Sequence, residues 1–439
     1  MAAFDMALGI NLQDTLNKTI SSVYSSNHKE YFMGSYSIEI VGKKAEIKWD
    51  ISKPPSLELE PVRELKPSEM AESVIPEILK KLPMFKDIRN IISKQVTDSI
   101  KTATFRMFFP ELTITARLPI GQRSATFSSN VICTVPVNPN GQIGLAAIRL
   151  DLDPSVRKLD FLSPIIDSLS GPILLAVNNV LKGIRIPFTS VEGITLGPPT
   201  PVISGGRLIL LFNLASKASP APILGPYPWP NEAIFSLSNE ELINKAIEYS
   251  YDTLKIPHEV SSIGSKETFL TTFYYGAILR VGRPGFRTKG EYLAVSIQSG
   301  GNLYAGFTTI FGNVGFNYNI VIQPTPLECM GRLSLNSSQQ LELYIPNVPV
   351  AVVLFQPQGN FAETIISALF SIGINITSLI LANFLPQIIG SIRIPIANVP
   401  SISVDIGDVH LKIQATDLRV GGSNGMAMIA GSLIVAPNR

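Results

Sequence analysis

Four segments of the chain carry apolar side chains at every third or fourth position, the spacing that places them on one face of an α-helix. Two of these segments are amphipathic, and the other two are apolar well beyond a single stripe, as expected for helices enclosed by sheet. The amphipathic segments present Leu12, Leu16, Ile20 and Val23, then Leu242, Ala246 and Tyr249, and the apolar segments present Leu162, Ile166, Leu169, Ile173, Val177 and Val180, then Phe361, Ile365, Leu369, Ile372, Ile376, Ile380 and Phe384.

Other segments alternate apolar and polar residues, which indicates antiparallel strands with one buried and one solvated face. The clearest run from 45 to 51 and from 111 to 118, and further strands are expected at 402–406 and 411–414. Ser238 and Glu241 have the spacing of a capping box, so we expect a helix to begin there.

Self-comparison shows that the chain is an internal repeat. The series Asp14, Leu16, Asn17, Lys18, Ile20, Tyr24 recurs 227 positions later as Glu241, Ile243, Asn244, Lys245, Ile247, Tyr251. The segment Ile184-Arg-Ile-Pro-Phe188 recurs 208 positions later as Ile392-Arg-Ile-Pro-Ile396. Proline disfavours helical backbone in the residue before it, so each of these segments should end a long helix. Two matches in the same order indicate two copies of one unit.

The boundary between the copies is a proline-rich run beginning at Pro220, which cannot be helix or central strand and favours extended polyproline II. We therefore expect a first module at 1–216, a semi-rigid connector at 217–235 and a second module at 236–439. A helical insertion is expected at about 67–100. Its mixed charges favour a solvated helix packed on its own sheet over a helix lying on a membrane surface.

Composition excludes several classes of protein. The 439 residues are 45% hydrophobic and 16% charged, which excludes intrinsic disorder, and a net charge of +2 gives no footprint for nucleic acid. The three histidines have no partner at metal-ligand spacing, and no nucleotide-binding or hydrolase motif occurs. We expect neither enzyme activity nor a metal or other cofactor. The two cysteines, 196 residues apart, exclude a disulfide scaffold, and the alternation around Cys133 predicts a buried, inert thiol.

The charge-free segment 364–392 is long enough to span a bilayer. Its polar and proline residues, among them Ser371, Asn375, Asn383 and Pro386, and the absence of flanking aromatic and basic clusters favour a helix buried by the protein itself. The N-terminal residues lack a basic region, so a classical signal peptide is not expected. We therefore expect a protein that is not integral to the membrane and is cytoplasmic as synthesised, or released without a classical signal.

With a tandem repeat, antiparallel strands, long apolar helices and a proline-rich connector, the chain resembles the tubular lipid-binding (TULIP) superfamily, in the tandem arrangement of the bactericidal/permeability-increasing (BPI) protein group. The opening, Phe4-Asp5-Met6-Ala-Leu8 followed by Leu16-Asn17-Lys18, also resembles the clostridial P-47 branch, found beside toxin genes. That branch usually has tryptophan where Phe4 stands, and the secreted group's disulfide is absent. The resemblance implies an α+β fold of two modules, each a highly curved antiparallel sheet wrapped around one long apolar helix.

Two functions follow as hypotheses. One is non-enzymatic binding of lipid or another long apolar ligand in a seam between helix and sheet, together with transient membrane contact. A mean hydropathy of +0.26 favours this hypothesis. The alternative is a bacterial toxin-cluster accessory or scaffold that acts through a protein partner. The candidate ligand-lining residues are Leu162, Ile166, Leu169, Ile173, Val177, Ile365, Leu369, Ile372, Ile376 and Ile380. The same residues could instead simply fill the core.

Overall fold

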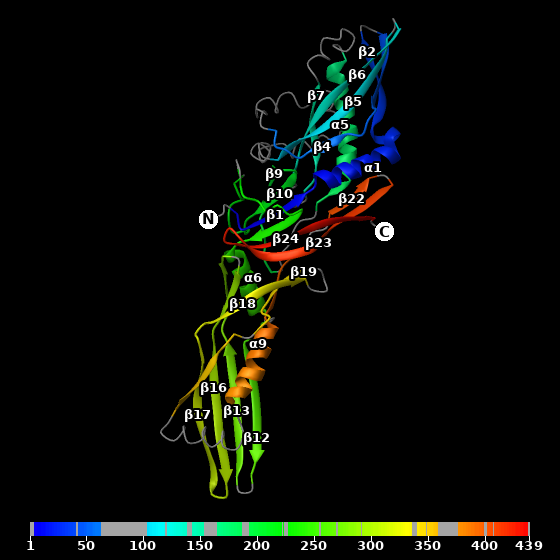
Figure 1. Cartoon of the computed structure of the whole chain (residues 1–439). Coiled ribbons are helices and arrows are strands. Elements are labelled where there is room, and N and C mark those ends of the chain that lie inside the picture. The colour runs from blue at the N-terminus through cyan, green and yellow to red at the C-terminus, as the bar shows by residue number, and fades with distance from the viewer. Residues whose placement is uncertain are drawn as a thin grey trace.

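Antiparallel sheet dominates the fold. In Figure 1 the molecule is elongated, with both labelled chain ends near its middle and a group of strands extending to either side. The computed structural model describes residues 4–40, 43–62, 103–118, 121–137, 143–152, 165–186, 193–221, 223, 227–253, 256–268, 271–290, 292–335, 340–347, 349–358, 376–398, 402–406 and 408–437.

An eight-stranded antiparallel sheet at the middle of the molecule is built from both halves of the chain. Four of its strands precede residue 217 and four follow it, and β1 pairs with β11 where the two halves meet. In spatial order the strands are β8 (Ile184–Arg185), β22 (Ile402–Ile406), β23 (Val409–Ser423), β24 (Met426–Pro437), β11 (Ile234–Ser238), β1 (Met6–Asn11), β10 (Arg207–Phe212) and β9 (Thr200–Ser204).

The first half adds a second antiparallel sheet. The strands predicted at 45–51 and 111–118 are confirmed within β3 and β5, and the apolar members of the first alternation are buried. The strands are β2 (Met33–Ile40), β3 (Lys43–Ile51), β4 (Ser56–Glu58), β5 (Thr104–Leu118), β6 (Gly121–Thr134) and β7 (Ala146–Leu152).

The second half carries two five-stranded antiparallel sheets. One follows the order β12 (Glu259–Glu267), β13 (Thr272–Val281), β16 (Ser299–Thr309), β17 (Gly312–Gln323) and β20 (Val352–Pro357). The other follows the order β14 (Gly285–Lys289), β15 (Tyr292–Ile297), β18 (Leu327–Leu335), β19 (Gln340–Tyr344) and β21 (Arg393–Asn398).

The helices follow the predicted apolar periodicity, with two corrections. The described helical segments are α1 (Gln13–Tyr31), α5 (Ile166–Leu181), α6 (Glu240–Asp252), α8 (Ile376–Leu379), the π-helical turn η3 (Ile380–Phe384) and α9 (Leu385–Ser391). As predicted, α5 and α9 both end just before their Ile-Arg-Ile-Pro segments.

The first correction concerns the start of α6, because the predicted capping box is wrong. The N-cap is Asn239, whose side chain accepts a hydrogen bond from the Leu242 N–H at 2.8 Å. Ser238 is instead the last residue of β11, paired with Met6, and Glu241 forms an ion pair with Lys217. Sheet pairing therefore holds Ser238 in extended backbone and moves the cap one residue along.

The second correction concerns the long apolar helix expected from 361 to 384. Its described part is interrupted by the π-helical turn at Ile380–Phe384. Pro386 follows, and a proline lacks the N–H that would bond the carbonyl four residues earlier, which accounts for a local change of helical pitch. A continuous α-helix is therefore wrong for 376–391, and the earlier residues of the prediction lie outside the described ones.

Side chains of α1 fasten the helix to the backbone of the first half. The Asn17 amide accepts a hydrogen bond from the Leu57 N–H at 2.6 Å and donates one to the Leu57 carbonyl at 3.1 Å. One turn earlier, Gln13 accepts from the Leu59 N–H at 3.0 Å. One helix face therefore binds a short strand and the residue after it.

The same arrangement recurs around α6. The Asn244 amide accepts from the Phe286 N–H at 2.7 Å and donates to the Phe286 carbonyl at 3.0 Å, while Glu240 accepts from the Thr288 N–H at 2.7 Å. Asn244 and Glu240 stand 227 positions after Asn17 and Gln13, the offset found in the sequence. This repeated geometry supports an internal duplication.

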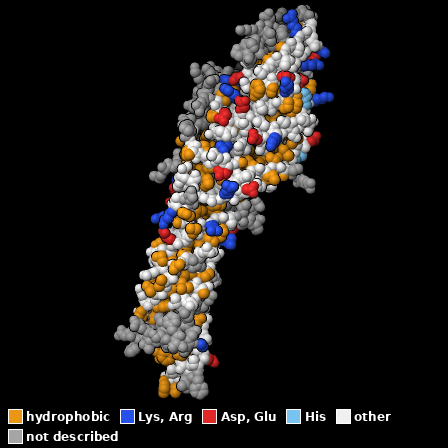
Figure 2. Space-filling view, in the orientation of Figure 1, with side chains coloured by type: hydrophobic (Ala, Val, Ile, Leu, Met, Phe, Trp, Pro, Cys, Tyr) orange, Lys and Arg blue, Asp and Glu red, His pale blue; other side chains and the backbone are white. Residues whose placement is uncertain are grey.

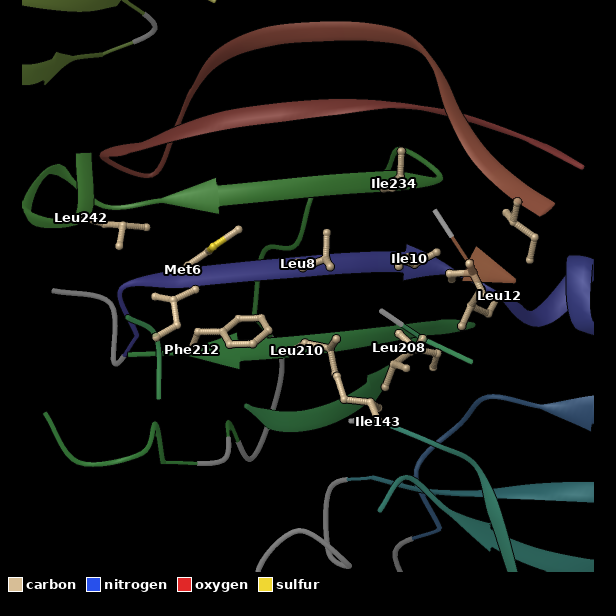
Figure 3. Close-up of a cluster of buried hydrophobic side chains, with 14 of the residues drawn as sticks. Met6, Leu8, Ile10, Leu12, Ile143, Leu208, Leu210, Phe212, Ile234 and Leu242 are labelled. Carbon is tan, nitrogen blue, oxygen red and sulfur yellow. The ribbon is translucent and has the colours of Figure 1, made fainter. Parts of the chain in front are cut away.

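A hydrophobic core runs through both halves of the chain. At the middle sheet, Met6, Leu8 and Ile10 of β1 lie beside Leu208 and Phe212 of β10 (Figure 3). The same cluster continues into buried side chains of α5, of α9 and of the second-half sheets, among them Leu169, Ile173, Val177, Leu303, Ile320, Ile388 and Ile389. One apolar interior therefore spans the junction.

The connector packs on the opposite face of the middle sheet. Trp229 stacks on Phe4 and Phe235, both with centroids 5.9 Å apart, and Tyr227 lies 4.1 Å from Trp229 between ring centroids. Phe4 and Phe235 belong to a second buried cluster with Ile209 and its neighbours. Strand β11 begins at Ile234, within the last residues of the predicted connector.

Asp5 ties three segments together at the same junction. Its buried carboxylate accepts hydrogen bonds from the Leu214 N–H at 2.9 Å, from Asn239 at 2.7 Å and from Lys217 at 2.8 Å. Lys217 also bonds Glu241 at 2.7 Å. The first residues of β1, the chain after β10 and the start of α6 thus share one ionised group.

The coarse fold class, antiparallel sheets with few helices, is confirmed. The arrangement of each module around a long apolar helix stays a prediction, as do the domain limits 1–216 and 236–439. The helical insertion expected at about 67–100 lies outside the described residues.

Candidate functional site

The first candidate surface for an apolar ligand is helix α5. Leu169, Ile173 and Val177 are buried on one side of it. Asn178, the next residue, is also buried, and its amide accepts from the Ala147 N–H at 2.8 Å and donates to the Ala147 carbonyl at 3.1 Å. Because both polar ends of this amide are bonded, it fixes α5 against β7 without an unpaired polar group.

The second candidate surface is the apolar segment 376–391. Among its described side chains, Ile380, Leu385, Ile388 and Ile389 are buried in the main core. No charged residue interrupts this segment in the sequence. It therefore presents a wholly uncharged helical surface to the interior of the second half.

The structure places four of the ten predicted lining residues in the main core: Leu169, Ile173, Val177 and Ile380. Ile166 and Ile376 lie in α5 and α8, with side chains outside the described part. Leu162, Ile365, Leu369 and Ile372 lie outside the described residues altogether. Whether these residues line a ligand or only fill the core stays a prediction.

Titratable groups give little support to covalent chemistry. Cys133 and Cys329 are both free and buried. Burial raises the pKa of the Cys133 thiol well above its ordinary range and that of Cys329 to about 11. Neither thiol is therefore ionised near neutral pH, as expected for inert core residues. Among the residues that the structure describes, no group of histidine, cysteine and acidic side chains is placed to hold a metal ion.

The length and hydropathy of the described helices decide whether they could span a membrane. Within the described part of the chain, none is both long enough and apolar enough to cross a bilayer. The first twelve residues of the charge-free segment 364–392 lie outside that part.

Sequence reasoning missed an exposed apolar site at the end of the β16–β17 hairpin. Ile310 and Phe311 form its turn and are 88% and 94% exposed. In Figure 2 hydrophobic side chains gather over this end of the molecule, whereas charged side chains gather mainly over the other end. The available signal was a 25-residue sequence without charge, 299–323, that contains an apolar pair next to a glycine.

Comparisons with known proteins give a likeness in structure but none in sequence. No family model matches the chain, and no curated protein matches it in sequence. A crystal structure of lipopolysaccharide binding protein aligns with 99% of this chain and 100% of its own, at 11% sequence identity and a TM-score of 0.33.

Proposed function

We propose that this protein binds lipid or another long apolar ligand without catalysing a reaction. The observation that carries the proposal is the pair of almost uncharged helical surfaces, on α5 and on 376–391, turned into one interior that spans both halves. An acyl chain placed along such a surface gains about 0.8 kcal/mol per buried CH₂, before the cost of ordering it. We propose that this ligand lies in a seam between helix and sheet.

The resemblance of the sequence to TULIP proteins, in a BPI-like tandem arrangement, supports the same function. The P-47-like branch and a role as a toxin-cluster accessory rest on the opening residues alone. In that alternative the interior holds only side chains, and the protein acts through a protein partner. Ligand content therefore distinguishes the two hypotheses.

The test is the ligand content of the purified protein. Native mass spectrometry and organic extraction should reveal apolar molecules bound to the protein, and a delipidated sample should take up a fluorescent fatty acid. Ile173→Phe should reduce that uptake several-fold, because a larger side chain fills space along α5.

The matched control is Ile209→Phe. Ile209 is equally buried but belongs to the second cluster, on the opposite face of the middle sheet. Both variants are overpacked, so unfolding measurements should show similar losses of stability, about 1–3 kcal/mol. Protein that carries no ligand and takes none up would overturn the proposal, as would equal uptake by the two variants.

A further inference from the structure

The turn between β16 and β17 places two large apolar side chains in solvent. Thr309 and Gly312 pair with each other, so Ile310 and Phe311 are the two residues of the turn. The Phe311 N–H donates to the Thr309 hydroxyl at 3.2 Å, and that hydroxyl donates to the Gly312 carbonyl at 3.2 Å. Gly312 has a φ of 126°. Thr309 and Gly312 thus supply the turn chemistry, and the apolar pair is not needed to form it.

Two-residue hairpin turns ordinarily carry Asn, Asp and Gly. Isolated exposed apolar residues are common on protein surfaces, but a contiguous pair about 90% exposed at the outermost point of a hairpin is not explained by folding. A contact outside the chain would account for the pair.

The two strands that carry this turn contain no charged residue. No charged residue occurs between Ser299 and Gln323. The nearest charges in the register are on the exposed end of β12, where Glu267 aligns through β13 with Thr308. The turn therefore extends about two residues beyond the level of these charges, roughly 7 Å at the rise of a β-strand.

Two tyrosine hydroxyls lie behind the apolar pair, at about the level of Gly306, four residues before Ile310. The Tyr274 hydroxyl is 3.5 Å from the Val314 carbonyl and 3.4 Å from the Tyr304 hydroxyl. Their rings lie on the outer face of the sheet above glycines, because a Cβ at Gly306 would press on Tyr274 and one at Gly315 would overlap Tyr304. Aromatic rings with a polar end are favoured where an apolar layer meets water.

From these observations we propose that the β16–β17 turn inserts Ile310 and Phe311 into the interfacial layer of an uncharged lipid surface. The depth available before Glu267 and its neighbour Lys266 is close to the 5–10 Å that interfacial segments occupy, and this mixed pair of charges suits zwitterionic headgroups. Two side chains bury far less than the roughly 1,000 Å² expected of a stable protein interface, which favours a membrane over a second protein. The inference is independent of the ligand-binding proposal.

The test is binding of the full chain to phosphatidylcholine vesicles, measured by co-sedimentation. Replacement of both residues, Ile310→Ser with Phe311→Ser, should reduce the partition coefficient about tenfold or more. The matched control is Val350→Ser, because Val350 is 93% exposed and lies near the other end of the same sheet. Val350 is two residues from Val352, which pairs with Gln323. Gln323 is eleven residues along β17 from Gly312, so this control is roughly 36 Å from the turn at 3.3 Å per residue. It should bind as the unaltered protein does.

A second measurement reports insertion directly. Phe311→Trp should show a blue-shifted emission maximum on adding vesicles and quenching by brominated acyl chains, whereas Val350→Trp should show neither. Binding to the neutral vesicles should also change little between low and high salt, because the vesicles carry no net charge and the opposite charges of Lys266 and Glu267 offset each other.

Four outcomes would overturn the inference: no binding to phosphatidylcholine vesicles, equal loss in the Val350→Ser control, binding that requires anionic lipid, or a protein dimer that the double variant abolishes. Ligand content by mass spectrometry is read separately on the same samples. Failure of vesicle binding and failure of ligand binding can therefore be told apart.

Discussion

At the scale of single residues, Asp5 shows how a buried charge is kept ionised. Burial by itself raises the pKa of its carboxyl, but hydrogen bonds from Lys217, Leu214 and Asn239 outweigh burial and hold the pKa below its ordinary value of 3.8. A carboxyl whose pKa is lower in the folded state than in the unfolded state stabilises the fold at pH values above its unfolded-state pKa. That contribution is lost as the pH falls below 3.8 towards the folded-state pKa.

Asp5→Asn should therefore lower the free energy of unfolding by about 2 kcal/mol at pH 7, because it removes the bonds to charged and amide donors. The difference from the unaltered protein should shrink below pH 3.8. Urea unfolding between pH 3 and pH 7 measures both effects, with Asp252→Asn, at an exposed position, as the control. A difference that stayed constant across this range would contradict the assignment.

The sequence identified some of these residues but not their roles. Asn17 and Asn244 were visible as a repeated pair, yet their bonds to Leu57 and Phe286 depend on strands about 40 residues away, and periodicity carries no such information. The exposure of Ile310 and Phe311 was equally hidden, because an apolar pair in a sequence usually indicates a core.

At the scale of elements, the fit between β1 and β11 leaves no room for a side chain at Gly9. A Cβ there would overlap the ring of Phe235 in the neighbouring strand. Gly421, in β23, has open space at the same position. The two glycines therefore form a matched pair for testing how tightly the strands of the middle sheet are packed.

Gly9→Ala should destabilise the protein by about 1–3 kcal/mol or more, since a buried ring in a packed sheet must move. Gly421→Ala should change stability by less than about 0.5 kcal/mol. Thermal and urea unfolding of both variants provides the measurement. Equal effects of the two substitutions on stability would show that the Phe235 ring can move at little cost, and would contradict tight packing at Gly9.

Elements with a clean period were predictable, and the others were not. The alternation in β3 and β5 and the stripes of α1 and α5 arise because one face meets the core and the other meets water. In β16 the glycines at 300, 301 and 306 interrupt the alternation, so the contrast that marks a strand is weak there, whereas β17 does alternate from Val314 to Ile322. The cap of α6 and the π-helical turn were missed because a strand pairing and a proline decided them locally.

At the scale of the whole molecule, the two halves share hydrogen bonds as well as a core. The repeat predicted two similar units, but no pattern in the sequence indicated that β1 and β11 would join one sheet or that β8 would pair with β22. The connector adds the cluster of Phe4, Tyr227, Trp229 and Phe235 over that sheet. The covalent link is therefore one of several attachments between the halves.

A chain cleaved at a protease site introduced after Ala221 should consequently remain one particle. Size-exclusion chromatography with light scattering should give the mass of the intact protein under native conditions, and two separate species only in denaturant. Trp229→Ala in the cleaved protein should lower the denaturant concentration at which the pieces separate. Separation in native buffer would mean that the shared sheet contributes little to association.

The register of the middle sheet also sets how the protein responds to force. β1 and β24 run parallel on either side of β11, with Met6 beside Ser238 and Ile10 beside Ile234, which in turn faces Gly431. Tension applied at residues 4 and 437 would therefore slide these strands lengthwise past β11. In that geometry the bonds of both ladders resist together, whereas peeling would break them one at a time. Stretched between these residues, the molecule should resist until both ladders break, and the strands outside the middle sheet should bear load only afterwards.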